Sequence, residues 1–97
     1  MNFTPSQELR MALLVRDFFV CAGAIYPHAH VWSCEDWSEQ GRVLDLYSSG
    51  IAICQQPLAA YPDQGPTHYA ALRFDSEADL LAQLDAIGYA DRPGRAV

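Results

Sequence analysis

The first quarter of the chain carries apolar residues at the spacing of one helix face. They stand at Met11, Leu14, Val15, Phe18 and Ala22, and the stripe is widened by Leu9, Leu13, Phe19 and Val20. A period near 3.6 is typical of an amphipathic helix. Thr4 and Gln7 form a capping box around Pro5, which suits the first helical position. Gly23 is a natural stop. We therefore predict a helix that begins at Pro5, ends before Gly23 and buries this stripe.

After residue 28 the period changes from 3.6 to 2, which is typical of strands. We predict four strands, at Ala29–Cys34, Val43–Tyr47, Ile51–Gln56 and Thr67–Phe74. The turn at residues 48–50 joins the second and third strands as a hairpin. The segment 57–66 contains three prolines and one glycine and is predicted to be a loop. In the fourth strand the predicted core side consists of His68, Ala70, Leu72 and Phe74.

The last predicted element is a second helix. Asp75 or Ser76 caps it, and the acidic residues Glu77 and Asp79 suit the positive end of the helix dipole. Its predicted buried stripe consists of Leu80, Leu81, Leu84 and Ile87. Gly88 ends the helix.

The order α-β-β-β-β-α predicts a single α+β domain over residues 1–90, followed by a flexible C-terminal tail over 91–97. We expect a four-stranded antiparallel sheet with both helices packed on one face. Two helices cannot cover both faces of such a sheet, so the other face must be solvated or covered by a second copy. We therefore predict a homodimer.

Charge narrows the range of functions. The 97 residues include no lysine, and six arginines stand against twelve acidic residues, which gives a formal net charge of −6. Without lysine the chain can form neither a P-loop phosphate site nor a Schiff base. An acidic surface repels the phosphates of nucleic acids, so we expect no direct nucleic-acid binding.

The cysteines and the N-terminus indicate the compartment. Cys21, Cys34 and Cys54 are odd in number and widely spaced, which favours free thiols in a reducing cytoplasm. The N-terminus lacks the basic and apolar regions of a signal peptide, and the longest apolar stretch, residues 18–26, is too short to span a membrane. We predict a cytoplasmic protein without membrane contact.

Acidic residues and tryptophans are concentrated between residues 32 and 39. The five are Trp32, Glu35, Asp36, Trp37 and Glu39. Tryptophan anchors many protein interfaces, and carboxylates attract basic partners. We predict that these five residues form the partner-binding surface. The alternative is that both tryptophans fold back onto the core.

The histidines offer a second hypothesis. His28 and His30 lie on one face of a predicted strand, with Cys34 further along it, and imidazole and thiolate are zinc ligands. A straight strand separates His28 from Cys34 by about 20 Å, so these side chains cannot all share one ion. The remaining metal geometry is His28 and His30 with His68 as a distant third ligand. The ordinary interpretation is a histidine pair at the rim of the sheet.

These patterns favour a small acidic interaction protein with no enzymatic activity, no catalytic residues and no cofactor. It would be an inhibitor, immunity or adaptor protein, of the general kind that phages and other mobile elements encode, and its partner would be a protein with a basic surface. The alternative is a small-ligand- or metal-binding α+β module. Its pocket would lie between sheet and helices and would contain His30, His68, Trp32 and Tyr69.

Overall fold

The computed structural model describes residues 3–26, 29–57 and 67–87. In this part of the chain two helices enclose six strands in sequence. They are α1 (Gln7–Val15), β1 (Phe18–Val20), β2 (Ala24–Tyr26), β3 (Ala29–Asp36), β4 (Val43–Tyr47), β5 (Ile51–Pro57), β6 (Thr67–Arg73) and α2 (Glu77–Ala86). The order across the sheet is β1-β3-β4-β5-β6, β2 pairs with β3 beside β1, and all paired strands are antiparallel.

An α+β fold with a helix at each end of an antiparallel sheet is confirmed, but the predicted count of four strands was wrong. The two additional strands come from residues 18–26, which were predicted to continue the first helix. That helix ends at Val15 because Asp17 adopts a φ of 65°, in the left-handed region that terminates helices. After it, Phe18 and Val20 are buried while Phe19 is exposed, and this alternation is that of a strand.

Helix α1 begins later than predicted and buries only part of the predicted stripe. Its N-cap is Ser6, whose Oγ accepts a hydrogen bond from the backbone N–H of Leu9 at 3.1 Å. Leu9 and Leu13 are buried. Three residues of the predicted stripe are exposed instead: Met11 at 58%, Leu14 at 41% and Val15 at 78%. The helix therefore leaves an apolar side facing outward.

Strands β1 and β2 form one interrupted edge strand. Val20 pairs with Cys34, and Ala24 pairs with Val31. Three residues of the edge strand thus face two residues of β3, which is the pattern of a β-bulge. The third of the bulged residues is Gly23.

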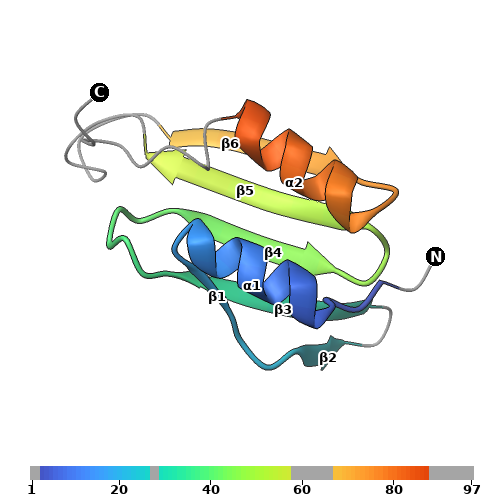
Figure 1. Ribbon diagram of the computed structural model, residues 1–97. Coiled ribbons are helices and arrows are strands. Elements are labelled where there is room, and N and C mark those ends of the chain that lie inside the picture. The colour runs from blue at the N-terminus through green and yellow to red at the C-terminus, as the bar shows by residue number, and fades with distance from the viewer. Residues whose placement is uncertain (1–2, 27–28, 58–66, 88–97) are drawn as a thin grey trace.

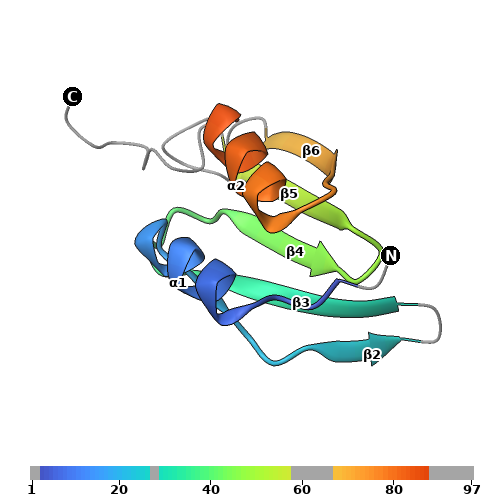
Figure 2. The same ribbon diagram turned by 45° about the vertical axis from the view of Figure 1, so that its right-hand side comes forward.

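Both helices lie on the same face of the sheet, side by side (Figures 1 and 2). Near the start of each helix, the Glu77 carboxylate accepts hydrogen bonds from the backbone N–H of Ser6, at 2.9 Å, and from the Ser6 hydroxyl. Near the end of each helix, Nε and Nη2 of Arg16 donate to the two carboxylate oxygens of Asp85, both at 2.9 Å. Because starts pair with starts and ends with ends, α1 and α2 run parallel.

The core lies between the helices and the sheet. Its fully buried side chains are Leu9, Leu13, Phe18, Leu44, Leu46, Ala52, Cys54, Phe74, Leu80 and Leu84, with Phe3, Val20, Trp32 and Cys34 almost as deep. Ala70 and Leu72 pack against it, as expected for that face of β6, and Ser76 caps α2, as predicted. In the described part of the chain no helix is long and apolar enough to cross a membrane.

At each edge of the sheet, a side chain from a helix donates a hydrogen bond to a backbone carbonyl that points away from the neighbouring strand. At β1, Nη1 of Arg10 donates to the backbone oxygen of Val20 at 3.3 Å. At β6, Nε2 of Gln83 donates to the backbone oxygen of Arg73 at 2.8 Å. Both carbonyls point outward because the N–H of the next residue points inward: Cys21 donates to Ser33 of β3, and Phe74 donates to Gly50, just before β5.

Gly23→Ala is expected to lower the free energy of unfolding by about 1–3 kcal/mol through overpacking. A Cβ here would lie 2.3 Å from Nε2 of His30 and 2.7 Å from Nε1 of Trp32, so both rings would have to move. Denaturant unfolding measures the loss, and Ala22→Ser at the exposed neighbouring position should change little. An unchanged free energy of unfolding in Gly23→Ala would contradict this packing.

Candidate functional site

The loop between β3 and β4 is organised by one carboxylate, that of Asp36. Its Oδ1 accepts hydrogen bonds from the backbone N–H of Ser38 at 2.9 Å, from the Ser38 hydroxyl, and from Nη2 of Arg42 at 2.7 Å. Its Oδ2 accepts from the backbone N–H groups of Gln40 and Arg42, at 3.3 and 3.1 Å, and from Nε of Arg42 at 3.1 Å. The loop passes through two left-handed residues, and these bonds hold it in that path.

The guanidinium of Arg42 is buried, with 3% of the residue exposed. Besides Asp36, it donates through Nη2 to the backbone oxygen of Arg16 at 3.0 Å, where α1 ends. Its Cζ lies 4.2 Å from the ring centroid of Phe18, a cation–π geometry. Arg42 thus fastens the β3–β4 loop to the end of α1 and to β1.

The ionisation of Asp36 follows from these contacts. Burial by itself raises the pKa of the carboxyl group, but hydrogen bonds from Arg42 and Ser38 outweigh burial and hold the pKa well below its ordinary value. Asp36 is therefore a carboxylate at neutral pH, and its two oxygens are occupied by the loop itself.

Exposed aromatic and acidic side chains lie beside this loop. The rings of Phe19 and Trp37 stack with centroids 5.0 Å apart and planes 4° apart. They are 41% and 57% exposed. Nε1 of Trp37 donates to Oε2 of Glu35 at 3.1 Å, and Glu39 is exposed in the same loop. We call Phe19, Glu35, Trp37 and Glu39 the acidic–aromatic patch.

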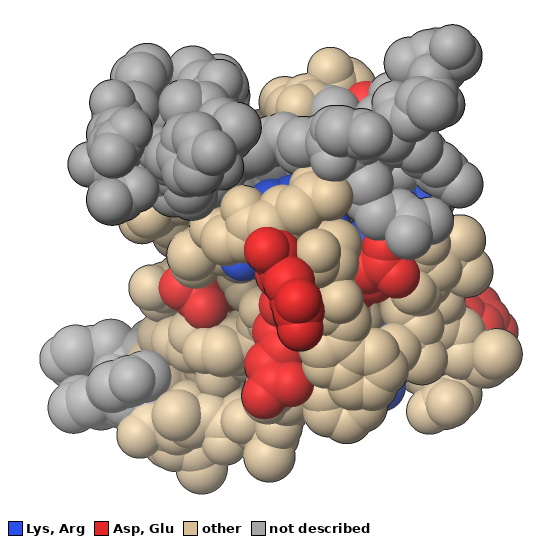
Figure 3. Space-filling model, turned by 90° about the vertical axis from the view of Figure 1, so that its left-hand side faces the viewer, with Lys and Arg blue, Asp and Glu red and all other residues tan. Residues whose placement is uncertain are grey.

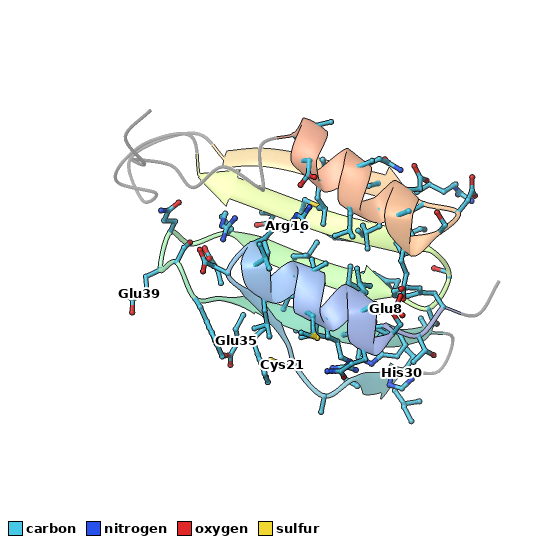
Figure 4. All side chains as sticks on the ribbon, viewed as in Figure 1. Glu8, Arg16, Cys21, His30, Glu35 and Glu39 are labelled. Atoms are coloured by element: carbon cyan, nitrogen blue, oxygen red, sulfur yellow. The ribbon has the colours of Figure 1, made fainter. Side chains whose placement is uncertain are left out.

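The patch lies at one end of the molecule. Figure 4 places Glu35 and Glu39 at the left-hand end of the ribbon. Figure 3 views the molecule from that side and shows a stripe of acidic atoms down the middle of the described surface, with few basic atoms in sight. Among the described residues Asp36 is paired with Arg42, whereas neither patch carboxylate forms an ion pair. The patch charges are therefore available to a partner.

The structure divides the five residues that were predicted to bind a partner. Three of them belong to the patch: Glu35, Trp37 and Glu39. Trp32 is 4% exposed and lies in the core, where its ring meets that of Phe3 edge-on at 5.9 Å. Asp36 is held by Arg42. Sequence reasoning missed Phe19 because it assigned the residue to a helix, and the alternation of residues 18–20 is the signal that could have found it.

The predicted metal ligands lie only partly in the described chain. The ring of His30 stacks on Trp32, with centroids 4.2 Å apart and an interplanar angle of 21°. His28 lies outside the described residues, as does the side chain of His68. Among the side chains that are described, no group of three or more could hold a metal ion. His30 lies far along β3 from Glu35 (Figure 4), and the metal hypothesis stays a prediction.

The described surface includes a hollow on the open sheet face and another beside α1. One has a volume of about 280 Å³ and lies on the sheet face opposite the helices, lined by Ala29, Val31, Ser33, Asp45 and Tyr47. The other has about 180 Å³ and lies between α1 and β1, lined by Gln7, Arg10, Met11, Leu14, Phe19 and Val20. Only the first has a carboxylate on its wall.

The thiols are poorly suited to nucleophilic chemistry. Burial, with a contribution from Asp45, raises the pKa of both Cys34 and Cys54 to about 12. Burial and the nearby Glu35 also raise the pKa of Cys21, which is partly exposed. Catalytic cysteines depend on a lowered pKa, which supplies thiolate at neutral pH. The surroundings of all three cysteines raise the pKa instead, so little thiolate forms at neutral pH.

Asp36→Asn is expected to lower the free energy of unfolding at neutral pH by about 3–5 kcal/mol, because it leaves the Arg42 charge buried without a counter-charge. The matched control is Asp85→Asn. Its ion pair with Arg16 lies at the surface, with 43% of the Asp85 side chain exposed, and the expected loss is about 1 kcal/mol or less. Equal losses in the two variants, measured by urea unfolding, would contradict the structural role of Asp36.

The same pair predicts a pH dependence. The pKa of Asp36 is lower in the folded than in the unfolded chain, so its stabilisation is complete above about pH 4 and is lost as the pH falls below that value. Unfolding of the wild type should therefore become steadily easier below about pH 4, and Asp36→Asn should show a shallower slope. Parallel slopes in urea titrations at several pH values would refute this assignment.

Thiol reactivity offers an independent check. With an aromatic disulfide reagent at about pH 8, Cys21 is expected to react in the native protein, while Cys34 and Cys54 react only as the chain opens. Cys21→Ser should remove the early phase and Cys54→Ser should retain it. An early phase that survives Cys21→Ser would show that a buried thiol is more reactive than its environment implies.

The chain matches no protein-family model, no curated protein and no solved structure.

Proposed function

We propose that the protein is a small, non-enzymatic, cytoplasmic binding protein of the inhibitor, immunity or adaptor type. Its partner is a protein with a basic surface, and the contact is made by the acidic–aromatic patch. The observation that carries this proposal is the exposed stack of Phe19 on Trp37, with Glu35 bound to the indole nitrogen.

Large aromatic side chains at the surface favour association. Tryptophan is enriched among the residues that dominate binding energy, because it buries a large rigid area at a small entropic cost. Here the ring is already fixed, by Phe19 on one face and by the hydrogen bond to Glu35 at its edge. A partner would not need to order this side chain, which lowers the cost of binding.

The charge of the patch supports a basic partner. Net charge is −6, and neither patch carboxylate has an ion-pair partner among the described residues. Exposed carboxylates steer a positively charged surface toward the site and accelerate association. An arginine of the partner could then lie against the indole of Trp37 while it pairs with Glu35 or Glu39.

We propose a protein without enzymatic activity because its cysteine thiols are poorly activated. The three cysteines are the strongest nucleophiles of a chain that has no lysine, and the environment of each raises its pKa. Among the described residues of the alternative ligand pocket, Trp32 lies in the core and His30 is stacked on it, which leaves neither ring free to line an open pocket.

Neutralising the patch is expected to weaken binding. The wild-type protein is immobilised, and the proteins that it retains from an extract of the host are identified. The affinity of the most abundant basic protein among them is then measured. Glu35→Gln with Glu39→Gln should slow its association several-fold, or about tenfold at low salt, and should flatten the salt dependence. Trp37→Ala should raise the dissociation rate about tenfold or more.

The matched control is Glu8→Gln with Asp75→Asn, which removes the same charge from exposed positions outside the patch. It should leave most of the affinity intact. If the control weakens binding as much as the patch variant does, net charge and not the patch is responsible. If the patch variants bind as wild type does, the partner uses another surface.

A further inference from the structure

The sheet face opposite the helices is more apolar than a solvated face requires. Val31, Tyr47 and Ile51 lie side by side across β3, β4 and β5, and Ile53 follows on β5. All four are only half-buried, while the alternate residues of the same strands form the core. The solvated face of an antiparallel sheet normally carries polar residues, and a contiguous apolar patch marks an interaction site.

The same face carries opposite charges on either side of this apolar centre. Asp45 lies on β4, where it is paired with Ile53 of β5. Arg73 lies on β6, where it is paired with Ile51 of β5. Strand β5 lies between them, so ideal sheet spacings put the two positions about 12 Å apart. Neither side chain forms an ion pair with a described residue.

The sheet face is hollowed next to Asp45. Asp45 and Tyr47 border the hollow of about 280 Å³ over β3 and β4. A guanidinium on its flexible stem would fit such a space, because its planar fork pairs with a carboxylate and stacks on an aromatic ring. The described chain supplies one arginine on this face, Arg73, and places it beyond β5 from the hollow.

We propose that a second copy of the chain covers this face. The two-fold axis passes close to Ile51 and Ile53, which pack against the same residues of the second copy. Arg73 of each copy then enters the hollow of the other and pairs with its Asp45. In an isologous interface every contact occurs twice, so the same two-fold rotation forms both Arg73–Asp45 ion pairs.

The size of the face suits a dimer of modest affinity. The dimer face consists of β3 to β6 and leaves out β1, whose Phe19 belongs to the acidic–aromatic patch. Four strands abreast and about six residues in length give roughly 400 Å² in projection, and the accessible surface of the side chains exceeds the projection. A specific interface needs about 600 Å² or more from each partner. The face is therefore near the lower limit, and we expect dissociation in the micromolar range.

Two further observations favour a second copy as the occupant. The face carries both signs of charge, so a uniformly basic partner would meet Arg73, whereas a copy rotated by two-fold symmetry satisfies both charges. Edge-to-edge pairing is hindered because Arg10 and Gln83 occupy outward carbonyls at the two borders. This inference does not depend on the acidic–aromatic patch, and the two can fail separately.

Charge reversal tests the contact. Sedimentation equilibrium of the wild type from about 10 to 300 µM should show a concentration-dependent monomer–dimer equilibrium. Asp45→Arg and Arg73→Asp should each weaken dimerisation about 100-fold or more, because like charges replace two attractive pairs. The double variant Asp45→Arg/Arg73→Asp should restore it, since each contact is again between opposite charges.

Mixing the single variants sharpens the test. Asp45→Arg carries two arginines at the contact and Arg73→Asp carries two aspartates, so an equimolar mixture should form a heterodimer although neither forms a homodimer. Far-ultraviolet circular dichroism and thermal melting check that each variant is folded. Leu14→Glu, on the outward side of α1, should dimerise as wild type does.

A wild type that stays monomeric over this range would overturn the proposal. So would a dimer that survives both single reversals, or one that Leu14→Glu abolishes, because the interface would then lie elsewhere. The partner-capture experiment leaves this outcome unaffected, since the dimer is measured with the purified chain alone.

Discussion

The acidic–aromatic patch depends on one buried charge, that of Arg42. A guanidinium inside a small core is tolerated only where a counter-charge and several acceptors surround it. Asp36 supplies the charge, and the backbone carbonyl of Arg16 at the end of α1 and the ring of Phe18 lie against the guanidinium as well. That requirement fixes the path of the β3–β4 loop, including the left-handed backbone at Glu39. The loop then holds Trp37 against Phe19.

A second constraint decides which face of the sheet remains open. The bonds of Ser6 to Glu77 and of Arg16 to Asp85 tie the starts and the ends of the two helices together. The helices therefore cover one face as a single layer. The remaining described surface has two regions of different character: an aromatic, acidic end, and an aliphatic sheet face that carries both signs of charge. We propose a basic partner for the first and a second copy of the chain for the second.

Local signals predicted β3 to β6 and α2 well. These strands start at the predicted residues, and Ser76 caps α2, because alternation, turn residues and caps act over a few neighbouring positions. Strands β1 and β2 were missed because the chain is apolar throughout residues 18–26 and the helix ends at Asp17, whose left-handed backbone has no mark in the sequence. In the site, the exposure of Trp37 was predictable from its acidic neighbours. The burial of Trp32 and the occupation of Asp36 depend on contacts between distant elements, which no local pattern reveals.

The capped carbonyls at the sheet borders bear on the behaviour of the chain at high concentration. An open border is a template onto which further strands add, and repeated addition leads to fibres. Arg10 and Gln83 each obstruct one acceptor at opposite borders, and the bulge before Ala24 twists one of those borders away from a flat ribbon. Growth into filaments is thereby opposed at both ends of the sheet. Loss of either side chain would thus matter less for folding than for the tendency of the protein to polymerise.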